Sequence, residues 1–161
     1  LEGLSRGGVM GSKVLYFAYG SNMKTNWLRK RVPSARPIGR ARLFNKRLVC
    51  SKRSEDGSGK ANLEDSPGDV VWGVLYEIES SDLDKLDKVE GGYQRTTMRV
   101  QTNEDKLVAA EVYISTEVVL EAIPFDWYKE LLVSGAQEHQ LPENYIDFLK
   151  KLPSKPNEKK G

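Results

Sequence analysis

The turn between an apolar run and a helix-like segment near residue 20 carries residue types suited to binding an anion. Gly20 turns the chain where a side chain would obstruct, and Ser21 and Asn22 are good helix N-cap residues. Backbone N–H groups at such a turn have no partner inside the helix. The turn can therefore bind a carboxylate, a phosphate or a developing oxyanion. An ordinary strand-to-helix turn without a ligand has the same local pattern.

Glu90 differs from the other acidic residues, most of which occupy positions where water solvates them. It ends a helix-like segment, where the helix dipole disfavours a negative charge, and Gly91 and Gly92 after it allow a close approach to another element. A carboxyl group in such a place has a raised pKa and can serve as a general acid or base near neutrality. A solvated acid at a helix end is the alternative interpretation.

The residues that usually build metal and nucleophile sites are scarce. The sequence has no CxxC and no HExxH motif and a single histidine, so a metal site is not expected. We expect His139 at the surface near a helix end and Cys50 as a small core residue. A basic cluster between residues 40 and 53 has a single aromatic residue, Phe44, and so lacks the series of aromatic residues that stack bases. We interpret it as a solvated strand face.

Periodicity and turn signals place these residues on a mixture of strands and helices. Strands are expected over 14–19, 38–49 (one long or two short), 60–63, 70–78, 93–100 and 107–114, and helices over 23–31, 80–89, 126–139 and 141–149. A turn is expected at 66–69, and Gly73 inside a strand predicts a bulge or a close approach. The order of elements predicts an α+β fold, with a small mixed, barrel-like sheet flanked by helices.

Composition restricts the class of protein. The chain has 161 residues, of which 39% are hydrophobic and 30% charged, as expected for one globular domain. Its net charge of +2 argues against charge-driven binding to nucleic acid or a membrane surface. Cys50 is the only cysteine, which suits a reducing compartment, and we expect a cytoplasmic protein. We expect residues 1–12 to be a leader outside the fold, 13–152 to be the domain, and 153–161 to be a disordered charged tail.

Several motifs together resemble the gamma-glutamylcyclotransferase (AIG2-like) family. The matching segments are Tyr16-Phe17-Ala18-Tyr19-Gly20-Ser21-Asn22-Met23, then Ser66-Pro67-Gly68-Asp69-Val70-Val71-Trp72-Gly73, and Leu86-Asp87-Lys88-Val89-Glu90-Gly91. The similarity runs from about residue 14 to 152. It implies a small mixed β-barrel flanked by helices, no metal and no organic cofactor.

The resemblance also implies an activity and roles for individual residues. The α-amine of a γ-glutamyl substrate attacks its own γ-carbonyl, which gives 5-oxoproline and a free amine. Glu90 matches the catalytic acid/base, and the turn at Gly20, Ser21 and Asn22 matches the part that binds a carboxylate or oxyanion. The other positions that match the substrate pocket are tyrosines, namely Tyr19, Tyr93, Tyr113 and Tyr128.

Two departures from the best-known members place the substrate in question more than the reaction. Asn62 stands where some relatives have a small hydroxyl residue, and fewer residues separate Glu90 from Tyr93 than in vertebrate-type members. Both predict changes at the end of the pocket that holds the leaving amine. The alternative function is a non-catalytic module that binds γ-glutamyl ligands. We expect a small-molecule substrate, no nucleic-acid or membrane partner, and a monomer or homodimer.

Overall fold

The computed structural model describes residues 12–157, so the expected leader lies outside the described residues except for Ser12, and so does the end of the expected tail. The chain runs through β1 (Lys13–Ala18), the 3₁₀ turn η1 (Ser21–Met23), α1 (Thr25–Arg29), β2 (Arg36–Arg53), β3 (Gly59–Glu79), α2 (Ser80–Val89), β4 (Gln94–Thr102), β5 (Leu107–Ile114), α3 (Asp126–Glu138) and α4 (Glu143–Lys150). This order confirms the α+β prediction.

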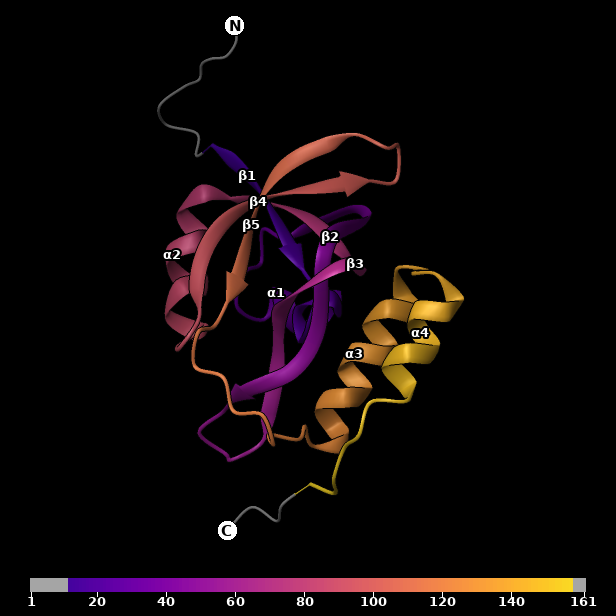
Figure 1. Cartoon of the computed structure of the whole chain (residues 1–161). Helices are drawn as coiled ribbons and strands as arrows, with labels where there is room; N and C mark the ends of the chain where they lie inside the picture. Colours follow the sequence, from indigo (N-terminus) through magenta and orange to yellow (C-terminus); the bar gives the residue numbers. More distant parts are fainter. Residues whose placement is uncertain (1–11, 158–161) are drawn as a thin grey trace, which may run out of the picture.

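The five strands form a closed barrel in the order β1-β3-β2-β4-β5. β1 pairs antiparallel with β3, where Tyr16 faces Tyr76, and it meets β5 in parallel at Tyr16 and Glu111. The parallel contact closes the barrel and makes the sheet mixed, as predicted. Figure 1 shows α2 on one side of the barrel and the packed pair α3 and α4 on the other.

β2 and β3 are much longer than expected and pair along most of their length. The expected strands 60–63 and 70–78 are one strand, because the turn predicted at 66–69 is a bulge within β3. Lys46 pairs with Asp65 and Phe44 with Val70, so four residues of β3 lie opposite Asn45 alone. Gly68 has φ +88°, and its N–H donates to the Asn45 side chain at 3.0 Å. The turn residues at 66–69 therefore form a local bulge, and the strand continues beyond them.

The expected helix over 23–31 is divided in two. Lys24 is extended, with φ −79° and ψ 109°, and it separates η1 from α1. A Cβ at Gly135 would lie 2.8 Å from both the Lys24 nitrogen and the Met23 Cβ. The glycine that weakens α3 by local propensity thus lets α3 pack directly on the turn after β1. That contact fixes the position of the turn.

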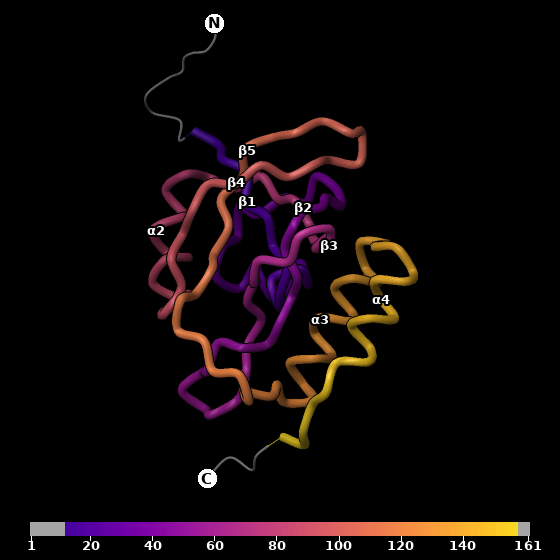
Figure 2. The backbone as a smooth tube through the Cα atoms, viewed as in Figure 1, coloured from indigo at the N-terminus to yellow at the C-terminus, as the bar shows by residue number. Residues whose placement is uncertain are grey.

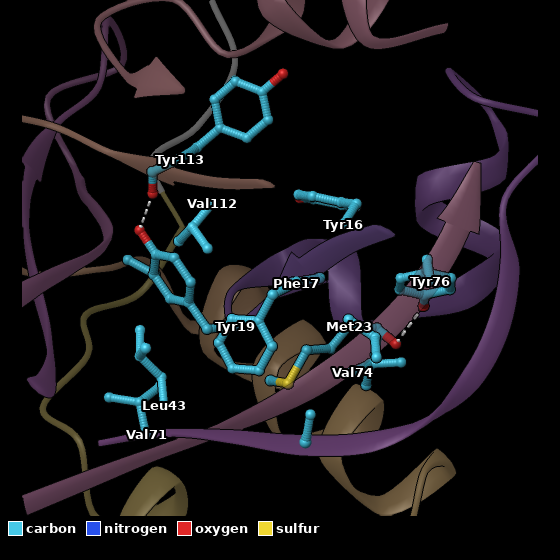
Figure 3. Packing of buried hydrophobic residues seen from close by; sticks show 14 of the residues in the cluster. Tyr16, Phe17, Tyr19, Met23, Leu43, Val71, Val74, Tyr76, Val112 and Tyr113 are labelled. Carbon is cyan, nitrogen blue, oxygen red and sulfur yellow. Dashed lines mark hydrogen bonds between the residues drawn. The ribbon is translucent and has the colours of Figure 1, made fainter. Parts of the chain in front are cut away.

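The core fills the barrel and the space between the barrel and its helices. Along β1 the side chains of Tyr16, Phe17 and Ala18 are all buried, because both faces of the strand are covered. Figure 3 shows Tyr16 and Phe17 among other residues of the core. Full burial of a side chain such as Phe17 contributes about 2–3 kcal/mol. A Cβ at Gly73 would lie 2.4 Å from the Ala18 carbonyl oxygen and 2.8 Å from the Phe17 ring. The predicted close approach at Gly73 is therefore present, and it brings β3 against the end of β1.

The carboxyl-terminal residues depart from the expected disorder over the part that the structure describes. Lys155 forms an isolated bridge with Phe125, accepts from the Asp126 N–H at 2.8 Å and donates to the Pro124 carbonyl at 3.0 Å. In Figure 2 this segment runs back past the start of α3. The Asp126 side chain accepts from Ser154 rather than capping α3. None of the helices in the described residues is long and apolar enough to cross a membrane.

Candidate active site

The residues expected to do chemistry come together at one narrow pocket. About 40 Å³ of it is open to the centre of a water molecule. All eight residues selected from the sequence line it, namely Tyr19, Gly20, Ser21, Asn22, Glu90, Tyr93, Tyr113 and Tyr128. They come from the turn after β1, the end of α2, the start of β4, β5 and α3. Closure of the barrel is what brings these distant segments to one place.

The turn after β1 lines this pocket and has backbone donors without a protein partner. Its first internal hydrogen bonds run from the Met23 N–H to the Gly20 carbonyl and from the Lys24 N–H to the Ser21 carbonyl. Within residues 12–157, the N–H groups of Gly20, Ser21 and Asn22 donate no hydrogen bond to another protein group. A Cβ at Gly20 would lie 3.1 Å from Ala61 Cβ and 3.2 Å from the Tyr128 hydroxyl. Glycine therefore allows the turn to lie close against β3 and α3.

Glu90 is the first residue after α2, and its carboxylate turns inward. Its N–H donates to the Leu86 carbonyl at 2.9 Å, and its Oε2 accepts from Asn22 Nδ2 at 3.1 Å. Burial raises the pKa of the Glu90 carboxyl, while the Asn22 hydrogen bond and the charge of Arg31 oppose that increase. The net direction is upward, toward the range in which a carboxyl group both takes up and returns a proton.

Asn22 fixes the Glu90 carboxylate relative to β1. The Asn22 side chain is only 5% exposed, and its Nδ2 donates both to Glu90 and to the Tyr16 hydroxyl, at 2.9 Å for the latter. Its Oδ1 has no hydrogen-bond partner among the described residues. We expected Asn22 to act through its backbone, and it also positions the Glu90 carboxylate through its side chain.

The tyrosine hydroxyls of the pocket are mostly bound to backbone. Tyr19 donates to the Tyr113 carbonyl at 2.5 Å (Figure 3), and Tyr93 donates to the Ala61 carbonyl at 2.6 Å. Tyr128 accepts from the Ala61 N–H at 3.0 Å. Burial is the main cause that raises the pKa of each of these tyrosines, so they are neutral at physiological pH. They therefore stiffen the wall of the pocket and do not supply charge.

Tyr113 reaches a second acidic residue. Its hydroxyl donates to Asp87 Oδ1 at 2.5 Å, and Arg95 lies 3.3 Å from the same oxygen. This interaction joins β5 to α2 one helical turn before Glu90. It holds the end of α2 against the barrel.

Three pocket residues were not selected from the sequence: Tyr16, Phe17 and Ala61. Tyr16 and Phe17 lie inside the first motif, but nothing in an apolar run distinguishes a pocket wall from a core position. Ala61 has no chemical signal at all. It lines the pocket because β3 crosses beneath Gly20 there.

The prediction that Asn62 alters the pocket is wrong for this structure, because Asn62 does not line it. Asn62 is 1% exposed and points away from Ala61, as alternate strand residues do. Its Oδ1 accepts from the Ser115 N–H at 2.9 Å, and its Nδ2 donates to the Ser115 carbonyl at 3.0 Å. Asn62 therefore connects β3 to the segment after β5.

His139 and Cys50 lie outside this pocket. The side chain of His139 is only 11% exposed, contrary to the expected surface position, and its Nε2 lies 2.9 Å from Thr25 Oγ1. Burial raises the pKa of the Cys50 thiol to about 12, so it is not a thiolate near neutrality. Neither residue takes part in the arrangement around Glu90.

Comparison with known proteins agrees with this geometry. Residues 70–149 match the model of the AIG2-like family. The chain is 37% identical to the gamma-glutamylcyclotransferase of Mus musculus, over 96% of this chain and 85% of the mouse protein, and 36% identical to that of Homo sapiens, over 91% and 81%.

A solved structure described as a gamma-glutamyl cyclotransferase superimposes with a TM-score of 0.85 at 34% identity. The match covers 93% of this chain and 92% of that structure. Similarity therefore extends over sequence and fold together, and over nearly the full length of both. The chain belongs to the gamma-glutamylcyclotransferase family of enzymes.

Proposed function

We propose that this protein converts a γ-glutamyl compound to 5-oxoproline and releases the attached amine. The α-amino nitrogen of the substrate attacks its own γ-carbonyl carbon and closes a five-membered ring, and the bond from that carbon to the leaving nitrogen breaks. No water is consumed, because the attacking nucleophile is the substrate's own amine. The α-ammonium group loses two protons as it becomes the lactam nitrogen, and the leaving nitrogen gains two as it departs as an ammonium group; one of these protons passes from the attacking nitrogen to the leaving nitrogen during the reaction. Family membership supports the reaction class.

Glu90 is the proposed carrier of that proton. Near neutrality the α-amine of the substrate is largely protonated, so a base must remove a proton before attack. A buried carboxylate with a raised pKa can also take the second proton, which the attacking nitrogen releases as the ring closes, and pass it to the leaving nitrogen. Asn22 holds the carboxylate in one orientation through the 3.1 Å hydrogen bond.

The turn from Gly20 to Asn22 is the proposed anion site. Its residues line the same pocket as Glu90, and its backbone donors can bind the oxyanion of the tetrahedral intermediate or the substrate α-carboxylate. The narrow pocket also holds the α-amine against the γ-carbonyl. Positioning of this kind contributes several orders of magnitude to an intramolecular reaction.

The observation that carries the proposal is that Glu90 and the free donors of the first turn line one pocket, although 68 residues separate Asn22 from Glu90. The test is incubation of the purified protein with γ-glutamyl-alanine, with 5-oxoproline and alanine measured by chromatography. We expect the two products in equal amounts. Saturable binding of the substrate without product would instead establish a non-catalytic binding module.

A further inference from the structure

The start of α3 forms part of the wall of two pockets that meet at Glu90. Tyr128, in the first turn of α3, lines the pocket described above, which we call the inner pocket. Trp127 lines a second, wider pocket, the outer pocket, which also contains Glu90 and Tyr128. The position of the α3 start therefore decides the shape of the site.

The first two residues after Asp126 place α3 against the proposed anion site. The Tyr128 hydroxyl accepts from the Ala61 N–H at 3.0 Å and lies 3.2 Å from the position that a Cβ at Gly20 would take. The Trp127 ring centre lies 5.4 Å from the Lys60 ammonium at the outer pocket. A shift of the α3 start therefore changes the contacts at the turn after β1 and in the outer pocket together.

α3 begins without a capping side chain at its own N-cap position. That position is occupied by Phe125, which makes no capping hydrogen bond. Two of the first donors of the helix instead bind the segment after α4. The Asp126 N–H donates to the Lys155 carbonyl at 2.8 Å, and the Trp127 N–H donates to Asn157 Oδ1 at 3.2 Å. The segment after α4 therefore supplies the cap that α3 lacks.

Residues 154–157, which we call the strap, have two further attachments. Ser154 Oγ donates to Asp126 Oδ1 at 2.5 Å, and the Lys155 N–H donates to the Pro124 carbonyl at 3.0 Å. In Figure 1 the strap, near the yellow end of the chain, runs beside the start of α3. All of these bonds end at the start of α3 or on the two residues before it, and the last two residues of the strap are exposed. The strap can therefore detach without unfolding of the barrel.

We infer that Ser154 and Asn157 are positioning residues: the strap holds the start of α3 in the orientation that binds substrate, and release of the strap weakens binding. This inference rests on the proposed function. When substrate binds only to the protein with the strap attached, its affinity falls in proportion to the attached fraction, whereas turnover of bound substrate is unchanged. By linkage, a bound ligand must also hold the strap in place.

The first test measures KM and kcat for γ-glutamyl-alanine in strap variants. Loss of one cap shifts such an equilibrium by about fivefold, so the double variant Ser154→Ala, Asn157→Ala should raise KM by about threefold or more and leave kcat within about twofold. Asn157→Asp keeps an acceptor for the Trp127 N–H and adds a charge that a helix start favours, so it should keep the wild-type KM. Asn144→Ala, exposed in the first turn of α4 and outside both pockets, is the matched control.

The second test follows hydrogen exchange at the Lys155 amide by NMR. Lys155 lines neither pocket, so a ligand in the site does not cover this amide. Saturation with 5-oxoproline, monitored at the Ser21 amide signal, should slow exchange at Lys155 by about threefold or more, because the ligand favours the attached strap. The Asp105 amide, which is bonded within the turn between β4 and β5, should keep its rate and so exclude a general stabilisation.

The outcomes separate the strap from the reaction. An unchanged KM in the double variant, with folding checked by circular dichroism, would overturn the inference and leave the proposed function intact, and so would exchange at Lys155 that does not respond to bound 5-oxoproline. Absence of product would instead refute the proposed function. The dissociation constant of γ-glutamyl-alanine, measured by NMR titration, then replaces KM and still tests the strap. Absence of both turnover and binding would overturn both proposals.

Discussion

The replacement of Glu90 by glutamine separates proton transfer from every other property of the site. Glutamine has nearly the same shape, and its amide oxygen can still accept the 3.1 Å hydrogen bond from Asn22. The pocket should therefore keep its form while losing a group that takes up and returns a proton. General acid/base catalysis is worth about 10²–10⁴-fold, so kcat should fall at least ~100-fold, or about 2.7 kcal/mol in activation free energy.

The same substitution should not destabilise the protein. Burial raises the pKa of Glu90 above its unfolded value, so folding favours the protonated carboxyl. The stabilisation from this group is fully present below the unfolded pKa and is lost as the pH rises through the folded pKa. At pH 7 the buried carboxylate therefore costs stability, and Glu90→Gln removes that cost. We expect an unchanged or higher free energy of unfolding in urea.

The assay is release of 5-oxoproline from γ-glutamyl-alanine as a function of pH, with unfolding measured on the same preparations. Wild-type kcat/KM should fall on the acidic side as Glu90 becomes protonated, at a pH above the range of an ordinary carboxyl, and Glu90→Gln should lack this limb. Glu104→Gln, in the exposed turn between β4 and β5, is the matched control. Activity of Glu90→Gln within threefold of wild type would refute the assigned role, and so would a loss of activity matched by a loss of stability.

Three further substitutions test the packing and the hydrogen bonds that position the site. Asn22→Ala removes a hydrogen bond that lowers the pKa of Glu90, so the acidic limb of the pH profile should move to higher pH and kcat should fall about tenfold; an unmoved limb would contradict this. Gly73→Ala places a Cβ 2.4 Å from the Ala18 carbonyl and should cost about 3 kcal/mol in urea unfolding, whereas Gly39→Ala, with open space around it, should be nearly neutral. Tyr76→Phe removes the hydroxyl that donates to the Met23 carbonyl and lies 3.0 Å from Thr25 Oγ1. It should lower the free energy of unfolding in urea by about 1–3 kcal/mol, whereas a decrease below about 0.5 kcal/mol would show that these groups find other partners.

Local sequence signals predicted some elements closely and others poorly. The bounds of α2 and β5 agree with the prediction. A serine at its start and two glycines after its end mark α2, and the turn signal before Leu107 marks the start of β5. The long β3 could not be predicted, because Gly68 with φ +88° normally ends a strand and here forms a bulge. The break at Lys24 was also not predicted, and it lies where α3 packs closely against the chain at Gly135, a residue more than 100 positions away.

The sequence predicted more of the candidate site than of the fold, but only for residues whose type and position indicate chemistry. Glu90 and the turn at Gly20 carry their own signals, namely a charge at an unfavourable helix end and an unusual backbone position. The outer pocket was missed because Lys60 and Arg31 belong to ordinary basic stretches, and only the folded barrel places them beside Trp27 and Trp127. Which charges converge is decided by strand pairing over long sequence distances, and a local pattern does not contain that information.

The seam between β1 and β5 has a consequence for how the protein becomes active. Their pairing at Tyr16 and Glu111 joins the first strand of the barrel to the last. During synthesis, the proposed anion-binding turn leaves the ribosome long before β5 and α3 do, so a growing chain cannot complete the pocket around Glu90 until those segments have emerged. A ligand that contacts both sides of that seam binds only the protein whose barrel is closed. Such a ligand should therefore raise the melting temperature of the protein.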